Sequence, residues 1–215
     1  PFLRLQHPSP RKNLEPRAPA TRAPRLAGTA EYSIPPGAKA SQARGMDERA
    51  SDGARVVRVE QGYIRGNCSA NHVCHFFNIP FAAPPIGALR FAHPTPASKW
   101  SGIRNASSLG PMCLQMASAT EPQGDEDCLY LNIWTTDRCM KTGGCAMLLF
   151  LHGGGYTIGS GINYDGGQLA SDAKNVIIAT TNYRLSAFGF AAVPVSAGQS
   201  TGNFGVQDQR AACVY

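Results

Sequence analysis

The first candidate for chemistry is a run of one histidine and three glycines, His152-Gly153-Gly154-Gly155. It directly follows the apolar stretch AMLLFL at 146–151, which is typical of a buried strand. Because glycine has no side chain to shield its backbone, the N–H groups of such a run can point at a bound oxygen. Preformed donors of this kind stabilise the negative oxygen that develops in acyl transfer. A glycine-rich turn without chemistry is the alternative interpretation.

Acyl transfer also needs a nucleophile, and one pattern in the chain offers a serine. Residues 198–202 read Gly-Gln-Ser-Thr-Gly, which fits Gly-x-Ser-x-Gly with Ser200 at its centre. A working elbow has a strand entering the turn and a helix leaving it. Here Pro194 interrupts the entry, and the exit continues as Gly202-Asn203. Ser200 is therefore not expected to be a nucleophile.

The histidines and cysteines do not suggest a metal centre. His72 and His75 lie near Cys68 and Cys74, but their spacing matches no standard zinc pattern. A hairpin closed by a small disulfide is the favoured interpretation of this segment. We expect neither a metal nor a cofactor.

The elements that must position the glycine run alternate between strand and helix patterns. Three apolar stretches, 129–134, 146–151 and 176–182, suit strands of a mostly parallel sheet covered on both faces. Short helices are expected at 168–174 and 208–215, and a loop-like region at 92–125. Shorter strands and turns precede them between residues 56 and 81. This order predicts an α/β fold, in which strand 176–182 would form the uncovered apolar edge.

Composition separates an N-terminal tail from the body of this 215-residue chain. Residues 1–54 hold eight of the 16 prolines and nine of the 20 Lys and Arg, so we expect a disordered Pro/Arg-rich tail there and a folded portion at 55–215. The body is near neutral, which argues against nucleic-acid binding. No apolar stretch is long enough for a transmembrane segment.

Seven cysteines favour an oxidising compartment, and thus the extracellular or secretory pathway. Two glycosylation sequons, at Asn67 and Asn105, agree with this prediction. The chain shows no signal peptide, and translation from Met46 would instead give a cytosolic protein. The pairs Cys68–Cys74 and Cys139–Cys145 are possible small disulfides.

Six ordered motifs between residues 56 and 215 closely resemble the type-B carboxylesterase/lipase (cholinesterase-like) family. They are 77–91 (FNIPFAAPPIGALRF), 100–102 (WSG), 126–134 (EDCLYLNIW), 152–155 (HGGG), 182–185 (NYRL) with 188–190 (FGF), and 202–205 (GNFG) with 208–209 (DQ). The resemblance implies the N-terminal part of an α/β-hydrolase fold, an incomplete, mostly parallel sheet preceded by antiparallel strands. It also implies hydrolysis of a small-molecule carboxylic ester.

The same resemblance assigns roles to individual residues. Gly154 and Gly155 would donate the oxyanion-hole hydrogen bonds. Cys113 and Cys128 match a disulfide at the base of a surface loop. Two structural ion pairs match as well, Arg90 with Glu126 and Arg184 with Asp208.

The family's nucleophile, acid and histidine all match positions beyond Tyr215, so this chain carries none of the catalytic triad and is expected to be inactive alone. The loop at 114–125 lacks an aromatic residue, which favours a general carboxylesterase over a cholinesterase. A non-catalytic adhesion protein of the neuroligin type is the main alternative, and a truncated pseudoenzyme is the third.

Overall fold

The computed structural model describes residues 53–142, 144–192 and 202–215. The expected tail, except for its last two residues, and Ser200 lie outside these ranges. Within the described residues, no helix is both long enough and apolar enough to cross a membrane.

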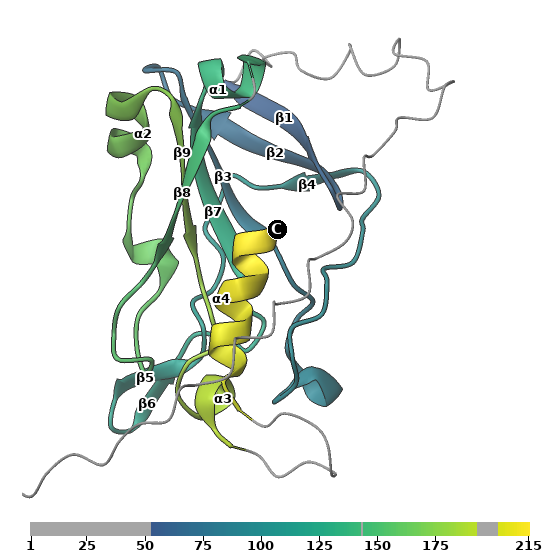
Figure 1. The fold of residues 1–215 in the computed structure, drawn as a ribbon, viewed down its shortest axis with the longest axis vertical. Helices are drawn as coiled ribbons and strands as arrows, with labels where there is room; N and C mark the ends of the chain where they lie inside the picture. Colours follow the sequence, from purple (N-terminus) through teal and green to yellow (C-terminus); the bar gives the residue numbers. More distant parts are fainter. Residues whose placement is uncertain (1–52, 143, 193–201) are drawn as a thin grey trace, which may run out of the picture. The chain divides into compact units, whose positions relative to one another are not determined.

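The core of the fold is a seven-stranded sheet in the order β1-β2-β3-β7-β9-β8, with β4 beside β2 (Figure 1). Its strands are β1 (Ala54–Val59), β2 (Gly62–Cys68), β3 (Val73–Pro80), β4 (Ile103–Asn105), β7 (Tyr130–Thr136), β8 (Ala146–Leu151) and β9 (Val176–Thr181). A separate hairpin, β5 (Gln115–Ser118) and β6 (Glu121–Gln123), forms in the region that was expected to be loop.

The predicted change from antiparallel to parallel pairing is present, but it comes later than expected. From β1 to β9 each neighbour on the path is antiparallel, and β8 is then parallel to β9. The expectation that β7 would belong to the parallel part is therefore wrong. Its apolar residues look like those of a parallel strand because β7 is central and covered on both faces.

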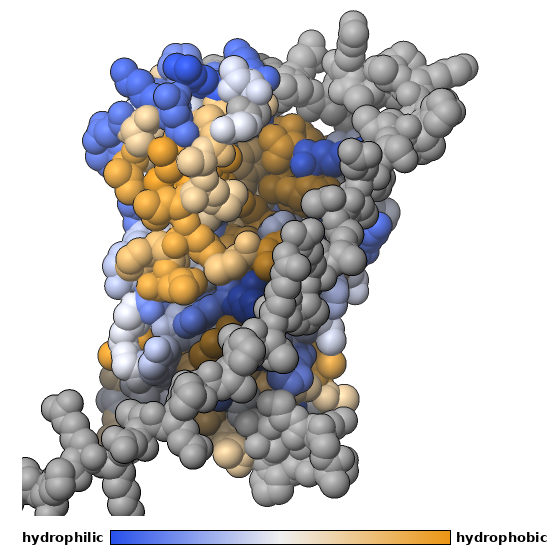
Figure 2. Space-filling view, viewed as in Figure 1, coloured by the Kyte–Doolittle hydropathy of each residue, from blue (hydrophilic) through white to orange (hydrophobic). Residues whose placement is uncertain are grey.

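The expected edge of the sheet is also wrong, because β9 lies between β7 and β8 and leaves β8 outermost. The chain runs from β8 through α2 (Gly167–Ala173) into β9, which returns between the two earlier strands. Exposed apolar side chains lie along β8; they are Met147, Leu148, Phe150 and Leu151. Figure 2 shows an apolar surface over this region of the sheet.

Side chains that alternate along the strands enter two clusters, one on each face of the sheet. On one face Trp134 and Ile178 pack with Ala170 of α2. On the other, Leu131 joins a larger cluster that includes Ala212 of α4 (Phe204–Val214). Helix α2 was predicted correctly to within one residue, whereas α4 begins four residues earlier than expected.

Four further helical segments were not predicted. They are α1 (Asp137–Thr142), α3 (Ser186–Phe190) and the single 3₁₀ turns η2 (Gly87–Leu89) and η3 (Gly161–Asn163). Both small disulfides are present, Cys68–Cys74 between neighbouring strands and Cys139–Cys145 across the end of α1. Cys213 is an exposed free thiol.

Candidate active site

The glycine run forms a tight turn at the end of β8. Gly154 and Gly155 have positive φ angles of 118° and 61°. A Cβ atom on Gly154 would lie 2.0 Å from the carbonyl oxygen of Ile158, so this position requires glycine. The N–H groups of Thr157 and Ile158 both donate to the carbonyl oxygen of Gly154, at 3.1 and 3.2 Å. The turn therefore folds back onto its own beginning.

The backbone N–H groups of Gly154 and Gly155 have no hydrogen-bond acceptor among the described residues. Both glycines are exposed. Two unpaired donors on neighbouring residues, carried by a turn that is closed by its own hydrogen bonds, can bind one oxygen that gains negative charge. These are the two residues for which the family resemblance predicts the oxyanion-hole role.

His152 supports the turn and is not placed to act as a base. Its ring is buried and stacks on Tyr183 with 4.4 Å between centroids. The Tyr183 hydroxyl donates to the His152 carbonyl oxygen at 2.7 Å. Burial lowers the pKa of His152, although a hydrogen bond to the Gly153 carbonyl acts in the opposite direction. The ring is therefore neutral near pH 7 and serves as packing beneath the glycine run.

Two buried amide side chains that the sequence did not single out support the residues after the turn. Asn182 accepts hydrogen bonds from the Ser160 hydroxyl and the Gly161 N–H, both at 2.9 Å. Its Nδ2 donates to the carbonyl oxygens of Pro111 and Cys128. Gln115 binds both backbone groups of Gly159. Asn182 occurs in one of the family motifs, but no sequence signal marked its role or that of Gln115.

The structure joins Cys113 and Cys128, which lie 15 residues apart, in a disulfide. The bridge closes the segment that carries β5 and β6. Closing a loop of this length restricts the unfolded chain by about 3 kcal/mol on the loop-entropy model. The bridge therefore helps to fix the segment from which Gln115 reaches the glycine turn.

The two expected ion pairs both form, but only one is buried. Arg184 donates two hydrogen bonds of 2.7 Å to the Asp208 carboxylate, and its backbone N–H donates a third at 3.0 Å. Their side chains are 4% and 0% exposed. Burial raises the pKa of Asp208, and the hydrogen bonds from Arg184 oppose this effect. The pair ties the segment after β9 to α4.

Arg90 and Glu126 also form a two-bond contact, at 2.6 and 2.7 Å. Their side chains are 44% and 20% exposed, so solvent screens this pair much more than the buried one. The hydrogen bond to Glu126 raises the pKa of Arg90, which stays charged. The pair joins the segment after η2 to the start of the motif at 126–134.

The predicted glycosylation positions are both accessible. Asn67 lies on β2 and Asn105 on β4, and both are exposed. The Asn105 side-chain oxygen accepts a hydrogen bond from the Ser107 N–H at 3.0 Å.

One group of potential metal ligands brings together Cys68, Cys74 and Asp137, whose ligand atoms lie within 4.8 Å of one another. The two sulfurs are bonded to each other, and Arg55 forms an ion pair with Asp137 at 3.3 Å. A disulfide and a paired carboxylate do not form a zinc ligand set.

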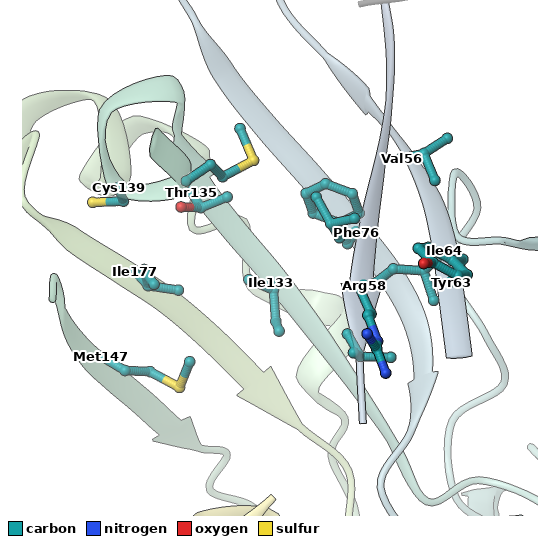
Figure 3. Close-up of a pocket in the computed structure, with 13 residues that line it drawn as sticks. Val56, Arg58, Tyr63, Ile64, Phe76, Ile133, Thr135, Cys139, Met147 and Ile177 are labelled. Carbon is teal, nitrogen blue, oxygen red and sulfur yellow. The ribbon is translucent and has the colours of Figure 1, made fainter. Parts of the chain in front are cut away.

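A large groove of about 440 Å³ lies on one face of the sheet, apart from the glycine turn. Its lining is mostly apolar and comes from several strands and α1; Figure 3 shows Phe76, Ile133, Met147 and Ile177 around this space. Among the described residues that line the groove, Arg58 is the only charged one. The groove has no set of groups for acyl transfer, so it is not the candidate active site.

Comparison with known proteins shows the family of the chain. The model of the Carboxylesterase family matches residues 53–215. "Cocaine esterase" of Oryctolagus cuniculus is 39% identical over 170 residues, which cover 73% of this chain and 31% of that protein. "Carboxylesterase 1D" of Rattus norvegicus is 39% identical over 166 residues, which cover 70% and 28%.

Solved structures show the same similarity. EstA of Aspergillus niger has a TM-score of 0.66 and 30% identity, covering 73% of this chain and 31% of its own. Carboxylesterase EST55 of Geobacillus stearothermophilus at pH 6.2 has a TM-score of 0.64 and 38% identity, covering 73% and 32%. These are α/β-hydrolase esterases, and the chain has part of their fold. It spans about a third of the length of these relatives.

Proposed function

The chain belongs to the carboxylesterase family, and from this premise we propose that it is the N-terminal part of a serine esterase acting on small-molecule carboxylic esters. The observation that carries the proposal is the pair of unpaired N–H groups on Gly154 and Gly155 at the end of β8. A serine attacks the ester carbonyl carbon, and the carbonyl oxygen of the ester becomes negative beside these donors. The alcohol leaves, and water then releases the acid from the acyl-enzyme.

By the same proposal, the nucleophile, acid and base of this reaction lie beyond Tyr215. The contribution of this chain is thus the oxyanion site and the elements that hold it. A general carboxylesterase fits better than a cholinesterase, because the segment between Cys113 and Cys128 offers no aromatic face for a quaternary ammonium group.

The main alternative is a non-catalytic adhesion protein of the neuroligin type. A shared fold does not decide between the two. The geometry favours the enzyme, because a binding protein does not need two unpaired N–H groups in a turn that excludes a side chain at Gly154. A truncated pseudoenzyme is the weaker third alternative.

We expect the complete gene product that contains residues 53–215 to hydrolyse p-nitrophenyl acetate and to be inactivated by phenylmethylsulfonyl fluoride on a serine beyond Tyr215. Residues 1–215 expressed alone should show no turnover above the Ser200→Ala variant of the same fragment. Absorbance assays and mass spectrometry of the labelled peptide measure both results. Turnover by the fragment that is lost in Ser200→Ala would contradict the assignment, and an unreactive complete product would favour the adhesion alternative.

We also propose that the protein passes through the secretory pathway. Three disulfides and two exposed sequons support this compartment. The native protein should lose mass on treatment with peptide N-glycosidase, with conversion of Asn67 and Asn105 to aspartate. Unmodified asparagine at both positions in protein from its natural source would argue for the cytosolic product that starts at Met46.

A further inference from the structure

Gln115 reaches from the disulfide-closed segment to the residue that follows the glycine turn. The residue is only 6% exposed. Its Oε1 accepts from the Gly159 N–H at 2.8 Å, and its Nε2 donates to the Gly159 carbonyl at 2.8 Å. Nε2 also donates to the Cys113 carbonyl at 3.0 Å. Both hydrogens of the side-chain amide are thus used, and Gly159 is held in two directions.

Gly159 in turn lies directly against the start of the glycine run. A Cβ atom on it would be 2.4 Å from Nδ1 of His152 and 2.5 Å from the carbonyl oxygen of Gly153. The carbonyl oxygen of the preceding residue, Ile158, would lie 2.0 Å from a Cβ atom on Gly154. Closely packed backbone transmits displacement, because no void absorbs it. A shift of Gly159 would therefore move the turn that carries the two unpaired N–H groups.

The other supports of the turn act elsewhere. Ser186 binds the carbonyl oxygens of Tyr156 and Thr157 at its tip. Asn182 binds Ser160 and Gly161 beyond it. In the described part of the chain, no side chain other than that of Gln115 forms hydrogen bonds to Gly159.

We propose that Gln115 is a positioning residue of the oxyanion site, which holds the Gly154 and Gly155 N–H groups in place through Gly159. The proposal rests on the proposed function for its effect on catalysis, but its effect on the turn does not depend on activity. Gln115 acts on the transition state and not on substrate binding, because the donors it positions matter most when the oxygen becomes negative.

The test uses Gln115→Met in the complete gene product, since methionine keeps the length of the side chain and removes its hydrogen bonds. Gln123→Met is the matched control. Gln123 is the Cα partner of Gln115 across the β5–β6 hairpin, and it is exposed. We expect kcat of Gln115→Met to fall about 10-fold or more with little change in KM, since small misplacements of catalytic groups have effects of this order. Affinity for a trifluoromethyl ketone, which forms a tetrahedral oxyanion on the serine, should fall by the same factor.

Hydrogen exchange measures the turn itself. Backbone amides of residues 153–159 should exchange faster in Gln115→Met than in wild type or Gln123→Met. If residues 153–159 exchange faster in Gln115→Met but the complete wild-type product has no esterase activity, the exchange supports the positioning role of Gln115 and the missing activity rejects the proposed function. Unchanged kcat, a change in KM alone, or unchanged exchange would overturn the inference. If Gln115→Met does not fold, Gln115→Asn, which keeps the amide but is one methylene shorter, decides by the same two measurements.

Discussion

Replacing Gly154 with alanine should reduce kcat of the complete esterase by about 10²–10³-fold, the loss that follows removal of one oxyanion donor. The added Cβ would lie 2.0 Å from the carbonyl oxygen of Ile158, and φ at this position is 118°. The backbone must therefore rotate, which moves the N–H groups of Gly154 and Gly155. Steady-state kinetics with p-nitrophenyl acetate measures the change, and KM should rise much less than kcat falls.

Gly153→Ala is the comparison for this variant. A Cβ on Gly153 meets no atom within 4 Å among the described residues, and its φ is not positive. The Gly153→Ala variant therefore tests whether any added methyl group in the glycine run disturbs the protein. An equal loss of kcat in the two variants, or full activity in Gly154→Ala, would contradict the assignment of the oxyanion site.

Replacing Asp208 with alanine should lower the free energy of unfolding by about 3–5 kcal/mol, because it leaves the Arg184 guanidinium buried without its partner. Arg184 is 4% exposed and uses its side chain and its backbone N–H to bind this carboxylate. Urea unfolding of the complete gene product, followed by tryptophan fluorescence, measures the loss.

Two variants make this result specific. Glu126→Ala removes the partner of Arg90 and should destabilise the protein far less, since that pair is partly exposed. The double variant Arg184→Met with Asp208→Leu should recover most of the lost stability, because it removes both buried charges. Equal losses for Asp208→Ala and Glu126→Ala would show that burial of the first pair does not matter for stability.

These two ion pairs show how far sequence reasoning reached. Their sequence separations are similar, 36 and 24 residues, and the family motifs predicted both contacts. Which pair is buried does not follow from either motif. It depends on α4, whose Phe204 packs against Arg184 and whose start was predicted four residues late.

The sheet gives a similar result. Residues 146–151 and 176–182 were identified as strands from their apolar composition alone, and the structure has β8 and β9 there. The predicted order of these two strands in the sheet was wrong, because composition does not say which of two apolar strands is central. In the structure β9 is buried along most of its length and β8 is mostly exposed.

The sequence by itself determined the family, the strand that leads into the glycine run and the glycines that carry the unpaired donors. These features can be recognised from residues that are adjacent in the sequence, because an apolar strand pattern is followed directly by three glycines. Only the tertiary structure decided what holds the run. Gln115 contacts Gly159 across 44 residues, and Asn182 reaches Pro111 across 71. Contacts of this kind depend on which segments the fold brings together, and a local pattern contains no information about them.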